Sequence, residues 1–502
     1  MVPMLLVVGC SETVQLGGDG GPGVPDVPRD AGTNPTDLSA MAGDGPGVSV
    51  DVPGVPVDGS AVPQDTGNPR DVVISQDSGA PVDAGPPAGD GVDLLFVIDN
   101  SNSMRDNQTQ IGRQIDALLT TLVSPPTDPA TGRPVYPPVR QMHVGVVSSD
   151  LGTPGSVVPS CANSDVGDDG LLNPIRQGQA IRTHQPWTTA PPGVRPARCT
   201  QNPTQYPSFL TFEAASTSPA EFVEDYVCNA YLSIGGCGLE QPLEAAYRAL
   251  VVRNARAQPG NNDPNAGFVR DRAVLAIVVV SDEEDGSVRD CRYQEPGDPD
   301  GDCRPPRGEG LGVYDIQSSD WAGFDLNQRF YLYTPGGPQD PTWNLNRYLD
   351  PARPARGFTS LKPGRPELVV FGGILGVPIN LPTRGEGVDW GALLGNNPDG
   401  SDGLTAMSPE GPVSMRQRNM DPACSQRVVP GCRREGTRYD PTNPPCDLQA
   451  QYYAWPSRRI AQVARRFAER YDNGVVGSIC RTSYADTLTQ LARSIQRRQR
   501  AE

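Results

Sequence analysis

Asp93-Leu-Leu-Phe-Val-Ile98 runs directly into Asp99-Asn-Ser-Asn-Ser103, and these residues give the strongest indication of the fold. The continuous apolar run predicts a strand that is buried on both faces of a parallel sheet. Ligands of such sheets bind beyond the carboxyl ends of the strands, where Asp99, Ser101 and Ser103 are expected. Three oxygen-bearing side chains at alternate positions predict a site for a divalent cation. The other interpretation is a polar turn that caps the helix expected from Arg105.

The chain from residue 91 onward alternates apolar strands with amphipathic helices, which predicts an α/β fold with a doubly wound, mostly parallel sheet flanked by helices. The expected strands are residues 93–98, 142–148, 273–281, 367–373 and 474–478. The expected helices are residues 105–123, 218–230, 240–256, 456–470 and 482–498. Phe209-Leu-Thr-Phe212 is the candidate for an antiparallel edge strand.

The Asp99-x-Ser101-x-Ser103 spacing resembles the signature of the von Willebrand factor A (vWA) domain, whose metal-ion-dependent adhesion site contains Asp-x-Ser-x-Ser. The resemblance implies one Mg²⁺ or Ca²⁺ ion. Ser101 and Ser103 would contact the ion directly. Asp99 and Asp282, which follows the strand expected at 273–281, would hold it through water.

The sequence departs from the vWA pattern at one ligand. The family often has Gly-Gly-Thr before a helix, and the matching run here is Gly235-Gly236-Cys237. A thiol is a poor ligand for a hard cation, and a disulfide-bonded cysteine offers no oxygen. Glu240 or Ser233 is the expected replacement, and a direct Glu240 ligand would favour Ca²⁺ and reduce the need for a partner's carboxylate. Alternatively, Glu240 only complements the positive end of the following helix.

The region from 91 to 500 is expected to be one domain with insertions at about 149–217, 282–366 and 374–455, because 56 glycines and 54 prolines require much loop. Residues 11–90 are rich in Gly, Pro and Asp, with thirteen acidic residues against two arginines. They predict a disordered, self-repelling linker. Because this linker carries most of the net charge of −17, the chain is not expected to bind nucleic acid.

The eleven cysteines indicate an exported protein. Residues 1–10 resemble a signal peptide with a bacterial lipobox, in which Cys10 is lipidated, although no basic residue precedes the short apolar run. A start upstream of Met1 would explain this departure. The remaining ten cysteines are an even number and predict disulfides. Local pairing predicts the bonds Cys161–Cys199, Cys228–Cys237 and Cys291–Cys303, with the other four cysteines left open.

Two acidic runs and one basic run lie at or near the ends of the expected elements. Ser281-Asp-Glu-Glu-Asp285 and Ser148-Ser-Asp150 are expected to surround the cation site, because each ends a strand. The basic residues Arg458, Arg459, Arg465, Arg466 and Arg470 are expected to form a solvated helix face.

The sequence argues against an enzyme, since it has two histidines and no HExxH, Cys-x-x-Cys or Ser-His-Asp pattern. We expect a non-catalytic protein of the bacterial cell envelope, lipid-anchored at the outer membrane or cell surface, that binds a protein or glycan ligand in a cation-dependent way. Membrane contact is expected through the lipid alone, because no segment reaches the about 18 apolar residues of a spanning helix. The alternatives are a structural or assembly component with a degenerate metal site, and an enzyme within the inserted loops.

Overall fold

The structure is a computed structural model. It describes residues 91–153, 158, 161, 167–173, 206–232, 234–253, 262–289, 329–330, 340–349, 357–385, 387–395, 424–426 and 452–499. The lipobox with Cys10, the linker at 11–90 and the Cys291–Cys303 pair lie outside these residues, as does Ser233, so the expectations about them stay predictions. Among the described residues, no helix has both the length and the apolar character needed to cross a membrane.

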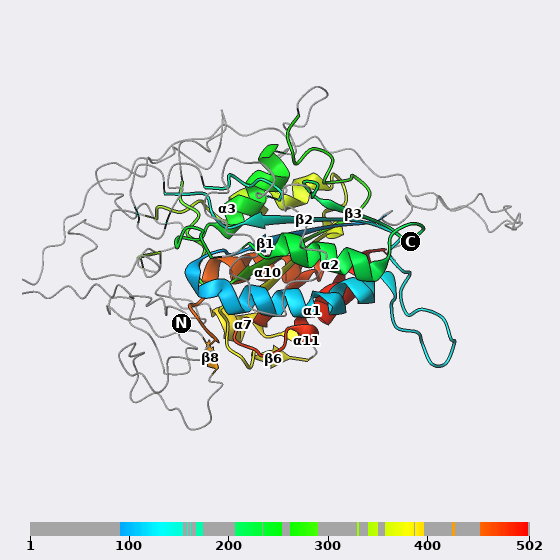
Figure 1. Cartoon of the computed structure of the whole chain (residues 1–502). Helices are drawn as coiled ribbons and strands as arrows, with labels where there is room; N and C mark the ends of the chain where they lie inside the picture. The colour runs from blue at the N-terminus through cyan, green and yellow to red at the C-terminus, as the bar shows by residue number, and fades with distance from the viewer. Residues whose placement is uncertain are drawn as a thin grey trace, which may run out of the picture. The chain divides into compact units, whose positions relative to one another are not determined.

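A six-stranded sheet in the order β10-β5-β4-β1-β2-β3 forms the centre of the described domain (Figure 1). Its strands are β1 (Val92–Ile98), β2 (Gln141–Ser148), β3 (Leu210–Glu213), β4 (Val274–Ser281), β5 (Val369–Leu375) and β10 (Gly474–Ser478). All neighbours are parallel except β3, which pairs antiparallel with β2. The predicted mostly parallel α/β sheet is confirmed, and the edge strand lies at the predicted place.

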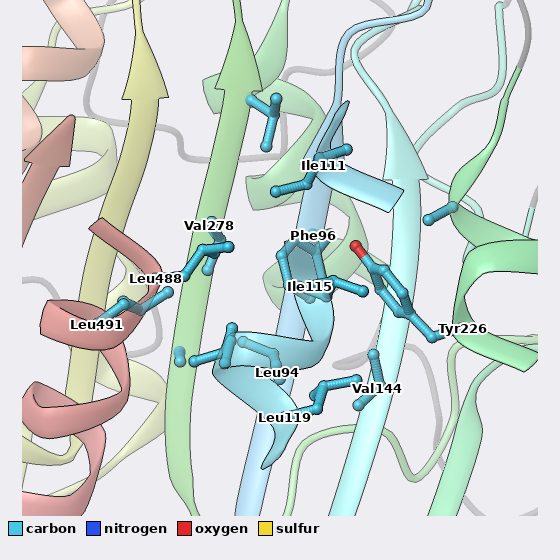
Figure 2. Close-up of a cluster of buried hydrophobic side chains, with 14 of the residues drawn as sticks. Leu94, Phe96, Ile111, Ile115, Leu119, Val144, Tyr226, Val278, Leu488 and Leu491 are labelled. Atoms are coloured by element: carbon cyan, nitrogen blue, oxygen red, sulfur yellow. The ribbon is translucent and has the colours of Figure 1, made fainter. Parts of the chain in front are cut away.

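The apolar run of β1 is continuous because both faces of this strand are covered. Leu94, Phe96 and Ile98 belong to one hydrophobic core, whereas Leu95 and Val97 belong to a second core on the opposite face. Figure 2 shows the first core, in which helix side chains of α1 and α11 pack over the residues of β1 and β4. Successive residues of a strand point to opposite faces, so a centrally placed strand must be apolar throughout.

Each core is closed by its own set of helices. The first core is covered by α1 (Arg105–Val123), α2 (Pro219–Ala230) and α11 (Ala485–Gln499). The second is covered by α3 (Pro242–Tyr247), by the π-helical segment Arg248–Val252 that continues it, and by α10 (Arg458–Tyr471). The helix expected at 240–256 is therefore partly π-helical.

The remaining elements are short. They are the helices α6 (Asn346–Leu349) and α7 (Trp390–Leu394), the 3-10 helices Asn102–Met104, Phe358–Leu361 and Pro366–Leu368, and the hairpins β6 (Thr383–Arg384) with β7 (Gly387–Val388) and β8 (Cys424–Gln426) with β9 (Tyr452–Ala454).

The strand order reverses direction at the centre of the sheet. From β1 the chain proceeds outward to β2 and β3, and then returns to place β4 on the other side of β1. The carboxyl ends of β1 and β4 therefore meet where ligands bind in open α/β sheets. The backbone N–H of Asp99 donates to the Val280 carbonyl at 2.9 Å, which fixes the end of β1 against β4.

The disulfides correct the local pairing expected from the sequence. Cys161 is bonded to Cys237 across 76 residues, so the predicted Cys161–Cys199 and Cys228–Cys237 pairs are wrong. Cys228 is also disulfide-bonded, and Cys424 is bonded to Cys480. Sequence spacing failed because the sheet brings distant loops to one edge: the backbone N–H of Cys237 donates to the Asp150 carboxylate, just after β2, at 3.2 Å.

Candidate metal centre

Asp99 is fixed in a fully buried position at the end of β1. Its Oδ1 accepts a hydrogen bond from the backbone N–H of Ser101 at 2.8 Å, and its Oδ2 accepts one from the Ser281 hydroxyl at 2.8 Å. Ser101 precedes the 3-10 helix Asn102–Met104 but makes no capping hydrogen bond with its side chain. Helix capping therefore does not explain why hydroxyl side chains occupy this turn.

The two serines connect β1 to the end of β4. The hydroxyl oxygens of Ser101 and Ser103 lie 3.0 Å apart, and the Ser103 hydroxyl donates to Asp282 Oδ1 at 3.1 Å. A chain of hydrogen bonds thus joins four of the five residues predicted as metal ligands, namely Asp99, Ser101, Ser103 and Asp282. These four residues lie close together because β1 and β4 are adjacent in the sheet.

Glu240, the fifth predicted residue, reaches the same edge of the sheet from the loop before α3. The Gly236 N–H donates to the Asn100 carbonyl at 2.9 Å, and the Gln241 N–H donates to the Ser149 carbonyl at 3.0 Å. The carbonyl of Glu240 itself accepts from Gly286 N–H at 2.7 Å. This loop therefore rests on the turns that follow β1, β2 and β4.

Glu240 joins Asp99, Asp282 and Glu283 in what we call the four-carboxyl cluster, every member of which is buried. Burial is the main cause that raises the pKa of all four groups. The negative charge of Asp99 raises the pKa of Glu240 and of Asp282 further. Glu283 hydrogen-bonds Glu240, and the charge of Glu240 and this bond both raise the pKa of Glu283.

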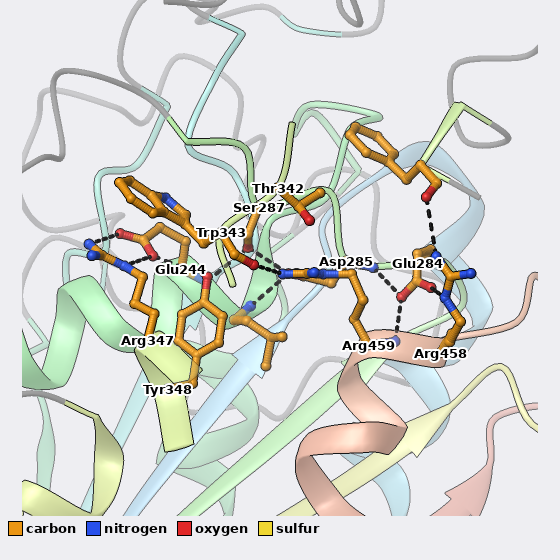
Figure 3. Close-up of polar contacts among 12 residues, drawn as sticks. Glu244, Glu284, Asp285, Ser287, Thr342, Trp343, Arg347, Tyr348, Arg458 and Arg459 are labelled. Carbon is orange, nitrogen blue, oxygen red and sulfur yellow. Dashed lines mark hydrogen bonds and ion pairs between the residues drawn. The ribbon is translucent and has the colours of Figure 1, made fainter. Parts of the chain in front are cut away.

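The same acidic run contains carboxylates that are paired with arginines. Arg459 Nε lies 2.9 Å from Asp285 Oδ2, and Arg458 Nε lies 3.4 Å from Glu284 Oε2 (Figure 3). Burial raises the pKa of Glu284 to about 7, although the charge of Arg458 opposes this shift. Nearby, Arg347 binds both oxygens of Glu244 at 2.9 and 3.0 Å.

These ion pairs correct the prediction of a solvated basic face on α10. Arg458 and Arg459 are only 2% and 3% exposed. They lie in the first turn of α10, which begins beside the acidic run, whereas Arg466 and Arg470 farther along the helix are exposed. The prediction was wrong for the first turn because the sequence does not show that this turn faces Glu284 and Asp285.

The four-carboxyl cluster has no such partner: within the described ranges, no arginine or lysine forms an ion pair with any of its members. Glu240 Oε1 and Glu283 Oε2 are buried and accept no hydrogen bond there. Buried charges in proteins are paired with an opposite charge or coordinate a metal. The arrangement is therefore suited to a cation.

The spacing of the ligand atoms indicates how a cation would be held. In the part of the chain that the structure describes, the only group of three Asp, Glu, Cys or His ligand atoms within 4.8 Å of one another is Asp150, Cys161 and Cys237. Two of these are the disulfide sulfurs, which are not available as thiolate ligands. The four-carboxyl cluster is thus more open than a cage of direct carboxylate ligands, and it leaves room for water between a carboxylate and an ion.

Asp150, which lies in one of the acidic segments expected near the site, makes other contacts. The Asp150 carboxylate accepts from the backbone N–H groups of Gly152 and Cys237 at 2.9 and 3.2 Å, which stabilises the loops around it. Asp169 pairs with Arg248 and Arg253. Glu283 was not predicted as a site residue, and its place in the run after β4 was the only available signal.

Comparisons with protein-family models, with curated proteins and with solved structures return no significant match for this chain.

Proposed function

We propose that the described domain is a vWA-like domain that binds one divalent cation and uses it to recognise a protein or glycan ligand, without catalysing a reaction. The observation that carries this proposal is the meeting of Asp99, Ser101, Ser103 and Asp282 beside buried carboxyls that lack a basic partner among the described residues. An ion in this position would neutralise the cluster and present an open coordination site.

The sheet supports the vWA resemblance. The Asp-x-Ser-x-Ser turn follows a central parallel strand, the second aspartate follows its neighbour β4, and the edge strand β3 is antiparallel. Each of these features agrees with what the resemblance implies about the fold and about the ligand positions.

In this proposal each side chain has a definite role. Ser101 and Ser103 bind the ion directly through their hydroxyl oxygens, while Asp99 and Asp282 hold it through water. Ser103 is exposed, whereas the other proposed ligands are buried, so an oxygen of the partner approaches from the side of Ser103. Cys237 supplies no oxygen because it is disulfide-bonded, and Glu240 takes the place of the missing hydroxyl.

The additional carboxyls favour Ca²⁺ over Mg²⁺. Ca²⁺ accepts six to eight oxygen ligands in flexible geometry, whereas Mg²⁺ requires a near-ideal octahedron and keeps several waters. Glu240 and Glu283 add two acidic groups to the set of Asp99 and Asp282, and this increases both the charge and the number of available oxygens.

We place the protein at the bacterial cell envelope, anchored through a lipid on Cys10 and held away from the membrane by the linker at 11–90. The disulfides Cys161–Cys237 and Cys424–Cys480 support this setting, since such bonds persist in oxidising compartments.

A structural or assembly role in an envelope complex is the second candidate. The hydrogen bond between the Glu283 and Glu240 carboxyls favours it, because a proton shared between two acids can satisfy part of the cluster without an ion.

Calorimetric titration of CaCl₂ and MgCl₂ into the purified chain tests the cation, with Asp99→Asn as the variant. We expect binding heat for the wild type and its loss in the variant; absence of heat in the wild type would contradict the proposal.

Capture of envelope proteins and glycans with and without EDTA separates the two candidates. If EDTA abolishes the capture of a protein or glycan, recognition depends on the cation. If the same partners are captured with and without EDTA, the structural role is supported.

A further inference from the structure

The disulfide Cys161–Cys237 lies beside the candidate cation site rather than in either main core. Together with Val158, Leu239, Val288 and Phe330, its two cysteines form a separate, small hydrophobic cluster. Cys237 is fully buried and Cys161 is 6% exposed. This cluster is built from loops that follow β2 and β4 and from the loop that carries Glu240, so it connects the segments that surround the site.

The loop between residues 234 and 241 is held tightly over the ends of the strands. The backbone N–H groups of Gly236 and Cys237 bond Asn100 and Asp150, respectively. A Cβ atom added to Gly236 would lie 2.1 Å from Asn100 Oδ1, so a larger residue fits only if the buried Asn100 side chain or the loop shifts. Glu240 follows Cys237 by three residues, and its placement depends on this segment.

Glu240 needs such support because the carboxylates around it repel its own negative charge. Its side chain is 2% exposed and lies near Asp99, Asp282 and Glu283. Like charges in a buried site repel one another, and among the described residues no basic side chain offsets this repulsion. Without a cation, the loop would relax away from the cluster unless something fixed it.

We propose that the Cys161–Cys237 disulfide is the positioning device that holds Glu240 in the cation site. The inference rests on the proposed cation binding and adds that the site's affinity depends on this covalent bond. A bond that closes a loop of 76 residues removes much of the conformational freedom of the segment that carries Glu240. The two cysteines act through Glu240 and do not contact the ion.

A double-mutant cycle tests this dependence by calorimetric titration of CaCl₂. The four proteins are the full chain, Cys161→Ala/Cys237→Ala, Glu240→Gln, and the triple variant. Alanine is used because the cysteines lie in apolar surroundings. We expect Cys161→Ala/Cys237→Ala and Glu240→Gln each to weaken Ca²⁺ binding about tenfold. The triple variant should bind Ca²⁺ about as weakly as either of them, because the effects of groups that act through one another do not add.

The Cys424–Cys480 disulfide provides a matched control at the same edge of the sheet. Its loop carries no member of the four-carboxyl cluster, although the backbone N–H of Trp455, which follows β9, donates to the Asp282 carbonyl at 2.7 Å. The effect of Cys424→Ala/Cys480→Ala should therefore add to that of Glu240→Gln, within about twofold in affinity.

Additive effects of Cys161→Ala/Cys237→Ala and Glu240→Gln, or unchanged affinity without the first disulfide, would overturn the inference. If the wild type itself binds no Ca²⁺, the proposed function fails instead, and the inference falls with it. Circular-dichroism melts report whether each variant is folded. If Cys161→Ala/Cys237→Ala does not fold, CaCl₂ is titrated into Cys424→Ala/Cys480→Ala before and after reduction with dithiothreitol; unchanged Ca²⁺ affinity after reduction of the Cys161–Cys237 bond would overturn the inference.

Discussion

Ser103 is the exposed member of the proposed ligand set, and it can be changed without opening the core. Its hydroxyl contacts both Ser101 and Asp282. We expect Ser103→Ala to weaken Ca²⁺ binding at least about tenfold, in line with the loss usually caused by removing a group that supports a metal site. Titration calorimetry measures the effect, and Asn102→Ala, at the exposed neighbouring position, is the control. Equal affinity of the two variants would show that the Ser103 hydroxyl does not bind the ion.

The raised pKa values in the four-carboxyl cluster predict how stability depends on pH. A carboxyl whose pKa is higher in the folded than in the unfolded state contributes stability below its unfolded pKa of about 4, and this contribution is lost as pH rises through the folded value. Without a cation, the melting temperature should therefore fall as pH rises above this unfolded value. Because Ca²⁺ favours the ionised form, the gain in melting temperature on adding CaCl₂ should grow over the same range.

Thermal melts at several pH values, with CaCl₂ or with EDTA, check this expectation. Glu244 and Glu284 also have raised pKa values, but they are paired with arginines, so their contribution should be the same in both conditions. The difference between the two melts isolates the cluster. A calcium-dependent gain that is constant with pH would mean that the cluster is not the binding site.

Some site residues could be predicted from local sequence and others could not. Asp99, Ser101 and Ser103 share one turn, and Asp282 follows an unmistakably apolar strand, so strand ends alone locate them. Glu283 was not predicted as a ligand, because the acidic run after β4 does not reveal which of its carboxylates form ion pairs with arginines. That distinction depends on α10, which is distant in the chain.

At the scale of elements, the first turn of α10 stabilises the edge of the sheet that carries the site. Arg459 donates to Asp285 and to the Trp343 carbonyl, at 2.9 and 2.7 Å. We expect Arg459→Met to lower the free energy of unfolding by about 3–5 kcal/mol, because it leaves a buried carboxylate without its partner. Urea unfolding measures the loss, and the exposed Arg466→Met on the same helix should change stability by less than about 0.5 kcal/mol. Similar stability of the two variants would contradict the buried ion pair.

The strands and most helices could be predicted because their periodicity is strong. The predicted bounds of α1 and β10 agree with the structure, since α1 has a regular apolar face and β10 is a short apolar run before the last helix. The disulfides could not be predicted, because their partners are set by sheet topology rather than by spacing. The continuation of α3 as a π-helix likewise left no signal in the apolar pattern.

At the scale of the whole molecule, cation binding should stabilise the folded domain, because the cluster is assembled only when β1, β4 and the loop before α3 are in place. Ligand at about 100 times its dissociation constant adds about 2.7 kcal/mol to the free energy of unfolding. We expect a shift of this size in urea unfolding when Ca²⁺ is added at that ratio, with Asp99→Asn as the insensitive control. The same shift in Asp99→Asn would place the ion elsewhere.

A crystal of the protein soaked in Mn²⁺ would show directly whether these side chains hold a cation, because Mn²⁺ accepts the same oxygen ligands as Mg²⁺ and Ca²⁺ and gives an anomalous signal. We expect one strong anomalous peak about 2.0–2.6 Å from the hydroxyl oxygens of Ser101 and Ser103, with Asp99 and Asp282 one water molecule away. A peak that does not contact these serines, or no peak at this edge of the sheet, would contradict it.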